Sequence, residues 1–241
     1  MNASPEAGTA VRWRTRIKIC GLTRWEDVDL ACQLGADAVG VVFAASPRRL
    51  GLDRAAELLA DVPGFVCRVG VFAGQTLEYV RDAVHRCHLD WAQLCGGESA
   101  AFARSMPEGL RVLRVVHVLG PEDVDGVRGY PAAGFLLDSP PSQGRQGGTG
   151  RTFDWTLAMP GGRLPWPRSQ VVLAGGLSPD NVALAIHRVR PGAVDVSSGV
   201  EAAPGTKDPA RLARFFTAVR QADAENYPHT ERRSTHHGKA G

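Results

Sequence analysis

What this 241-residue sequence lacks already excludes several kinds of protein. No apolar run approaches the roughly 18 residues of a membrane-spanning helix, and the first residues lack the apolar core of a secretory signal. The five cysteines are an odd number without a CxxC pair, which argues against a disulfide framework and against a structural zinc site. We therefore expect no membrane association and a reducing compartment, by default the cytoplasm.

A strong charge of one sign is also lacking. The net charge at pH 7 is +3, and much of the basic excess lies near the ends, in RWRTR and TERRSTHHGK, so no nucleic-acid-binding face is predicted. At 44% hydrophobic and 22% charged residues, the composition is that of a globular protein with a large core. The length suits one or two domains, although α/β barrels of about 200–250 residues commonly form one.

Short apolar runs alternate with helical segments along the chain. The runs are nearly free of polar residues, as is typical of parallel strands buried on both faces. The predicted strands are residues 16–20, 38–43, 65–72, 91–94, 111–118, 134–138, 170–176 and 193–199. Eight strand–helix units predict a single-domain (β/α)8 TIM barrel. The main alternative, an open doubly wound sheet, usually has fewer strands and often a GxGxxG turn, where this chain has CGLTRW.

The domain boundaries follow from composition. Residues 1–13 and 224–241 are polar and rich in small residues, which predicts flexible tails on either side of a barrel at 14–223. Two helix starts are also indicated, one by Thr23 with Glu26 and one by Ser178 ahead of Pro179 and Asp180.

The ligand site of such a barrel lies at the C-terminal ends of the strands. Cys20 ends the first predicted strand, where it is either a buried hydrophobe or a base or nucleophile. Asp138 ends the sixth, where desolvation would raise the pKa of its carboxyl and suit it to act as a general acid. Alternatively, Asp138 caps the following loop. Cys20 and Asp138 could face each other across a ligand.

Two further features suggest anion binding. Glycine-rich turns occur at 147–155, 174–181 and 197–201, and backbone N–H groups in such turns can hold a phosphate. A single turn of this kind would be ordinary, but three at late strand ends favour a phosphorylated ligand. Arg48, in SPRR, could pair with a carboxylate, although it could also be a surface charge.

These segments together resemble a known family. KICGLTRWEDVDLACQLGADAVGVVFAASPRRL, RVGVF, AQLCGGE, GFLLDS, GGTGRTFDW, LAGGLSPDNVALAI and AVDVSSGVEAAPGTKD resemble phosphoribosylanthranilate isomerases, in order, from about Arg16 to Gln221. The resemblance implies a cofactor-free Amadori rearrangement of N-(5-phosphoribosyl)anthranilate. Its product is 1-(2-carboxyphenylamino)-1-deoxyribulose 5-phosphate, in the third step of tryptophan synthesis from chorismate.

The resemblance also implies roles for particular residues. Cys20 is the general base and Asp138 the general acid. Arg48 binds the anthranilate part, and Asp195 lies near the ribose hydroxyls. The phosphate lies on the turns that contain Gly148, Gly150, Gly175, Gly176, Ser198 and Gly199. No metal is implied, and the family includes both monomers and homodimers.

Two positions depart from the family's pattern. Cys95 replaces the histidine of the usual QLHG, and FAASPRR is one residue shorter than the common FYPKSPR. Both changes lie on the ligand-facing rim, so a related sugar-phosphate isomerase with an altered substrate, or a non-catalytic ligand-binding barrel, remains an alternative. A redox or metal pair of Cys20 and Cys95 is disfavoured, because strands 1 and 4 lie about half-way round the barrel from each other.

Overall fold

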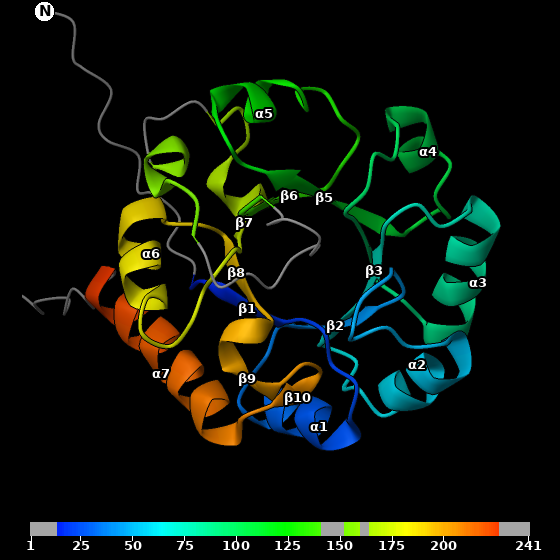
Figure 1. The fold of residues 1–241 in the computed structure, drawn as a ribbon, viewed down its shortest axis with the longest axis horizontal. Coiled ribbons are helices and arrows are strands. Elements are labelled where there is room, and N and C mark those ends of the chain that lie inside the picture. The colour runs from blue at the N-terminus through cyan, green and yellow to red at the C-terminus, as the bar shows by residue number, and fades with distance from the viewer. Residues whose placement is uncertain (1–13, 141–151, 160–163, 227–241) are drawn as a thin grey trace, which may run out of the picture.

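The computed structural model describes residues 14–140, 152–159 and 164–226. In these residues eight parallel strands form a closed barrel in the order β1 to β8 (Figure 1). The strands are β1 (Arg16–Ile19), β2 (Ala38–Val42), β3 (Cys67–Phe72), β4 (Trp91–Leu94), β5 (Arg111–His117), β6 (Gly134–Asp138), β7 (Val171–Leu173) and β8 (Ala193–Val196). The predicted single-domain (β/α)8 barrel is confirmed.

Helices surround the barrel as an outer ring (Figure 1). They are α1 (Trp25–Gln33), α2 (Leu52–Leu59), α3 (Leu77–Cys87), α4 (Ala100–Arg104), α5 (Pro121–Asp125), α6 (Val182–Val189) and α7 (Pro209–Asn226), with 3-10 turns η1 (Trp155–Ala158), η2 (Arg168–Gln170) and η3 (Ser198–Val200). Apolar side chains of strands and helices pack into one main core between the two layers. No helix in the described part of the chain is long and apolar enough to cross a membrane.

A short antiparallel hairpin follows β8 and is important for the site. It consists of β9 (Glu201–Ala203) and β10 (Thr206–Lys207), and its register places Lys207 opposite Glu201. The turn uses Gly205 at φ +81°, a left-handed conformation that favours glycine. The hairpin therefore brings two residues of opposite charge together at the end of the barrel.

Both predicted helix starts are wrong. The N-cap residue of α1 is Arg24, and no side chain caps it; the hydroxyl of Thr23 instead donates to the carbonyl oxygen of Gly205 at 2.6 Å. Helix α6 begins only at Val182, because Asn181 and Ser178 form a turn in which Asn181 Oδ1 accepts from the Ser178 N–H. At α1 a long-range contact replaces the cap, whereas at α6 the Ser178 hydroxyl still accepts from the Asp180 N–H at 3.3 Å, in a turn that precedes the helix.

The predicted end of the barrel at residue 223 is also too early. Helix α7 continues to Asn226 and lies between α6 and α1 in the ring (Figure 1). The Asp223 carboxylate accepts from both the backbone N–H and the hydroxyl of Thr15, at 2.8 and 2.6 Å. These bonds attach the last turns of the helix to the residue just before β1, which composition alone could not show.

Two cavities of similar size lie at opposite ends of the barrel. One, of about 400 Å³, is lined by residues at the strand beginnings, such as Ile17, Cys67 and Trp91. The other, of about 410 Å³, is lined by residues at the strand ends. Of the predicted site residues within the described ranges, several line the second cavity and none lines the first. The second cavity is therefore the candidate site.

Candidate active site

The cavity at the strand ends brings together five predicted residues from distant parts of the chain. Cys20 follows β1, Arg48 follows β2, Cys95 follows β4, Asp138 ends β6 and Asp195 lies on β8, and all five line the cavity. Closure of the barrel causes this convergence, because parallel strands direct their C-terminal ends to one face. Cys20 and Asp138 thus share one ligand-sized space.

The Cys20 side chain is buried against Val42, Ala44 and Val71. Burial raises the pKa of its thiol, and Lys18 lowers it only in part. At neutral pH the thiol of the unliganded protein therefore keeps its proton. The thiolate therefore needs positive charge from a bound ligand, in addition to that of Lys18, before Cys20 can act as a base.

Lys18 lines the cavity at the strand beginnings, but its ammonium lies next to Cys20 and Asp195 of the site, a neighbour that the sequence reasoning missed. Its ammonium pairs with Asp195 at 2.8 Å, and both side chains are more than nine-tenths buried. A Cβ atom added at Gly40 would lie 3.3 Å from Cys20 Sγ and 3.4 Å from Lys18 Cε, so the thiol and the lysine chain meet above this glycine. The signal was present, because residues two apart on a strand share a face and a lysine within RIKIC is unusual in a buried strand.

Asp138 ends β6 at the edge of the apolar barrel interior. Burial raises the pKa of its carboxyl, and the neighbouring His117 and the N–H and hydroxyl of Ser139 lower it only in part. A Cβ atom at Gly175 would lie 2.9 Å from Asp138 Oδ1, so this glycine also makes space for the carboxyl. The protonated carboxyl, which is the form that a general acid needs, is therefore favoured more at Asp138 than at an exposed aspartate.

Three further polar groups line the same wall of the cavity. Burial raises the pKa of the Cys95 thiol to about 12, so this residue is a neutral thiol near neutral pH. Gln93 is buried and its Nε2 contacts Cys95 Sγ at 3.5 Å, while its Oε1 has no hydrogen-bond partner. His117 Nδ1 lies 3.3 Å from the Ser139 carbonyl oxygen. That oxygen can only accept, so Nδ1 carries a proton.

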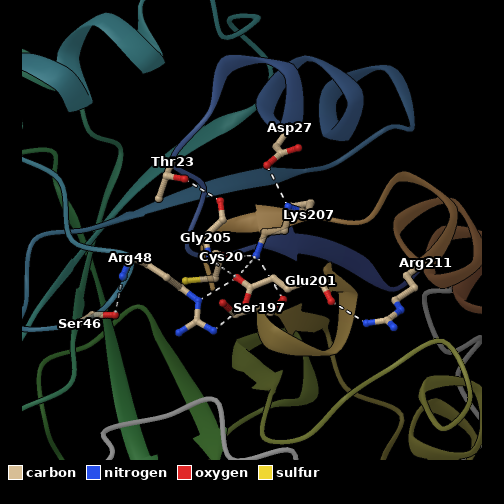
Figure 2. A network of polar contacts seen from close by, with 10 residues as sticks. All are labelled: Cys20, Thr23, Asp27, Ser46, Arg48, Ser197, Glu201, Gly205, Lys207 and Arg211. Carbon is tan, nitrogen blue, oxygen red and sulfur yellow. Dashed lines mark hydrogen bonds and ion pairs between the residues drawn. The ribbon is translucent and has the colours of Figure 1, made fainter. Parts of the chain in front are cut away.

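The guanidinium group of Arg48 already forms an ion pair within the protein. Its Nε and Nη2 donate to the two carboxylate oxygens of Glu201 at 2.8 and 2.6 Å (Figure 2). Sequence reasoning treated Arg48 as a ligand contact and assigned no role to Glu201, although Glu201 lies within the quoted motif. The chain reverses tightly at Gly21, with φ +70°, where an added Cβ would lie 2.5 Å from Arg48 Cδ. Gly21 therefore allows Arg48 to lie against the end of β1.

The late turns adjoin each other at the ends of β7 and β8. Gly175 and Gly176 adopt left-handed conformations, with φ of +76° and +63°. Ser198 begins η3, and Gly199 packs so closely on the Leu177 carbonyl oxygen that a Cβ would collide with it. The structure thus brings two of the three predicted phosphate-binding turns into contact. Gly148 and Gly150, in the third, lie outside the described residues.

The described residues contain no cluster of side chains that could bind a metal ion. No group of three or more His, Cys, Asp or Glu side chains is placed there to hold an ion. The five cysteines, all within those residues, are free. Cys20 and Cys95 share the cavity as separate thiols.

Comparison with known proteins identifies the family. The family model described as N-(5'phosphoribosyl)anthranilate (PRA) isomerase matches residues 17–218. The chain belongs to this family. The family and the class of enzyme predicted from the sequence, an isomerase, are therefore confirmed.

This chain aligns with relatives of the family along almost their whole length. Proteins named N-(5'-phosphoribosyl)anthranilate isomerase are 47% identical in Dechloromonas aromatica, over 213 residues, and 42% identical in Geobacter sp. strain M21, over 208 residues. The alignments cover 87% and 86% of this chain, and 98% of each relative.

Solved structures of the family share the fold. The Thermotoga maritima phosphoribosyl anthranilate isomerase matches with a TM-score of 0.78 at 39% identity, covering 86% of this chain and 99% of that chain. A phosphoribosyl anthranilate isomerase in complex with reduced 1-(o-carboxyphenylamino)-1-deoxyribulose 5-phosphate matches with a TM-score of 0.74 at 37% identity and the same coverage. A further match, to monomers generated from the T. maritima enzyme, describes that enzyme as dimeric.

Proposed function

We propose that this chain isomerises N-(5-phosphoribosyl)anthranilate to 1-(2-carboxyphenylamino)-1-deoxyribulose 5-phosphate, with Asp138 as general acid and Cys20 as general base. The observation that carries the proposal is that these two side chains, from β6 and β1, line one cavity at the strand ends. The proposed setting is tryptophan synthesis in the cytoplasm, by a monomer or a homodimer. The proposed ligand is a small phosphorylated molecule.

The first step opens the ribose ring. Asp138 donates its proton to the ring oxygen as the bond from C1′ to that oxygen breaks, and the anthranilate nitrogen supplies the electron pair that forms a protonated Schiff base. Burial keeps the Asp138 carboxyl protonated to a higher pH than an exposed aspartate would be. General acid catalysis of this kind contributes roughly 10²–10⁴-fold in rate.

The second step removes the proton from C2′. Cys20 releases its thiol proton to solvent, and the cation formed by ring opening and the ammonium of Lys18 both stabilise the resulting thiolate against the effect of burial. The thiolate takes the C2′ proton, and the electron pair neutralises the Schiff base to give an enolamine. Proton addition at C1′ and loss of the C2′ hydroxyl proton then give the ketone.

Binding would use the surrounding polar groups. The turns with Gly175, Gly176, Ser198 and Gly199 supply backbone N–H groups at successive strand ends for the phosphate. Arg48 lies on the cavity wall, where the substrate carboxylate can meet its charge. Asp195 lines the cavity while paired with Lys18, so an approach to a ribose hydroxyl would occur beside that ion pair.

The test follows the loss of anthranilate-type fluorescence when purified protein meets freshly made N-(5-phosphoribosyl)anthranilate. We expect rapid loss with the natural sequence and a rate roughly 10²–10⁴-fold lower with Asp138→Asn, because the amide cannot act as the acid. Circular dichroism of both proteins serves as the folding control. If the folded natural protein causes no loss beyond the uncatalysed rate, the proposed substrate is wrong and the alternative of an altered substrate takes its place.

A further inference from the structure

A buried network links the residue proposed as the base to the arginine proposed to bind the substrate (Figure 2). The Lys207 ammonium is fully buried and pairs with Glu201 Oε1 at 2.9 Å. It also donates to the carbonyl oxygens of Cys20 and Ser197 at 2.7 and 3.2 Å. The same Glu201 carboxylate binds Arg48 through both of its oxygens. One lysine therefore contacts the ends of β1 and β8 and, through Glu201, the arginine after β2.

The network is held from its outer side as well. The Lys207 backbone N–H donates to Asp27 Oδ2 at 3.0 Å, and Arg211 Nη1 donates to the Glu201 carbonyl oxygen at 2.6 Å. Asp27 and Arg211 each have an opposite charge of their own nearby, Arg24 at 3.7 Å and Asp208 at 3.8 Å. These pairs compensate each other and add no net charge.

The charges of Arg48, Lys207 and Glu201 do not cancel one another. Arg48 and Lys207 are positive, and Glu201 is the single carboxylate that both of them contact. A bidentate pair of Arg48 with Glu201 alone would be neutral and would attract an anion weakly. With Lys207 sharing the carboxylate, the trio has one positive charge in excess. Arg48 is its only member that lines the cavity.

We propose that Lys207 is a positioning residue for the isomerase reaction. It fixes the main chain of Cys20 relative to Arg48, and it offsets the charge of Glu201 so that Arg48 stays available to the substrate carboxylate. This inference rests on the proposed function for its effect on turnover. Its effect on anion binding can be measured even if the substrate is different.

The decisive variant is Lys207→Met, which keeps the length of the side chain and removes its charge and donors. Anthranilate serves as the carboxylate probe, and we expect the variant to weaken its binding by roughly tenfold or more. This is the usual effect of losing one hydrogen bond to a charged group. Binding of inorganic phosphate should fall clearly less than binding of anthranilate, because the late turns bind phosphate through backbone groups and Lys207 contacts only the Ser197 carbonyl oxygen beside one of them. The kcat should also fall, since the Cys20 carbonyl loses its donor.

A second variant separates the two roles and guards against misfolding. Lys207→Gln is neutral but keeps a donor group within the buried network. We expect anthranilate binding as weak as in Lys207→Met, with a kcat closer to that of the natural protein. Thr15→Val serves as the stability control, because it removes one hydrogen bond to Asp223 far from the cavity and should alter neither affinity nor kcat.

Either of two results would overturn the proposal. One is a folded Lys207→Met or Lys207→Gln protein whose anthranilate affinity and kcat stay within about twofold of the natural values, a range too small for a lost charge contact. The other is an equal loss of anthranilate and phosphate affinity, which indicates general loosening of the site. A third result would contradict the proposed function but not the role of Lys207. In it, the Lys207 variants bind anthranilate more weakly than the natural protein does, and the natural protein shows no isomerase activity.

Discussion

At the scale of single residues, the site is defined by charges placed inside an apolar barrel. Lys18 and Asp195 form a buried ion pair beside the Cys20 thiol. Such pairs contribute little to stability compared with apolar residues of the same size. We interpret the pair as part of the chemistry, because it brings a positive charge close to a thiol that has to lose its proton.

This interpretation predicts the pH dependence of Cys20 alkylation. The charge of Lys18 stabilises the thiolate, so it lowers the pKa of Cys20. Lys18→Met should therefore raise that pKa further, and alkylation by iodoacetamide should reach half its maximal rate at a higher pH than in the natural protein. The rate is followed by mass spectrometry of the peptide that contains Cys20, which distinguishes it from the other cysteines.

The matched control for this prediction removes both charges. Because Asp195 raises the pKa of Cys20, the double variant Lys18→Met/Asp195→Asn should shift the midpoint less than Lys18→Met alone. An unchanged or lowered midpoint in folded Lys18→Met would show that Lys18 does not stabilise the thiolate.

At the scale of elements, close approach between turns shapes the proposed phosphate site. Gly199 in η3 lies directly against the Leu177 carbonyl oxygen, which belongs to the turn after β7. A side chain at Gly199 would force these two turns apart. The glycine is therefore required by contact between turns, and the sequence alone showed only that the turn was rich in glycine.

We predict that Gly199→Ala lowers the free energy of unfolding by about 1–3 kcal/mol, the usual cost of overpacking, and weakens the binding of inorganic phosphate. Urea unfolding and calorimetric titration measure the two effects. Gly64→Ala is the matched control, because an added Cβ there meets nothing within 4 Å, and it should change stability by less than about 0.5 kcal/mol. Equal effects of the two substitutions would refute the importance of this contact.

At the scale of the whole molecule, the sequence predicted the architecture better than the contacts within the site. All eight strands were expected, because each is a short apolar run between turn signals. Six of the observed strands end within one residue of the expected end, whereas β7 and β8 end three residues earlier, since the glycine-rich turns begin before the apolar pattern ends. The helix starts and the end of α7 were wrong where distant residues, such as Gly205 and Thr15, supply the bonds.

The polar partners in the site could not be predicted either, because they are distant from one another in the sequence. Arg48 and Glu201 are 153 residues apart, Lys18 and Asp195 are 177 apart, and Lys207 and Cys20 are 187 apart. No local pattern specifies such pairs; they follow from closure of the barrel and from the register of β1 with β8, which places Lys18 opposite Asp195. Motif resemblance selected the residues proposed for acid and base, and the three-dimensional structure revealed the groups around them.

The role of Cys20 as the base is tested by comparing the natural protein with Cys20→Ala. Turnover is followed by the loss of substrate fluorescence. Binding is followed by titration with reduced 1-(o-carboxyphenylamino)-1-deoxyribulose 5-phosphate, an analogue of the proposed product. We predict that turnover falls roughly 10²-fold or more, as expected for loss of a general base, while the analogue binds with nearly unchanged affinity. A folded Cys20→Ala protein that isomerises the substrate at close to the natural rate would contradict the assignment of Cys20 as the base.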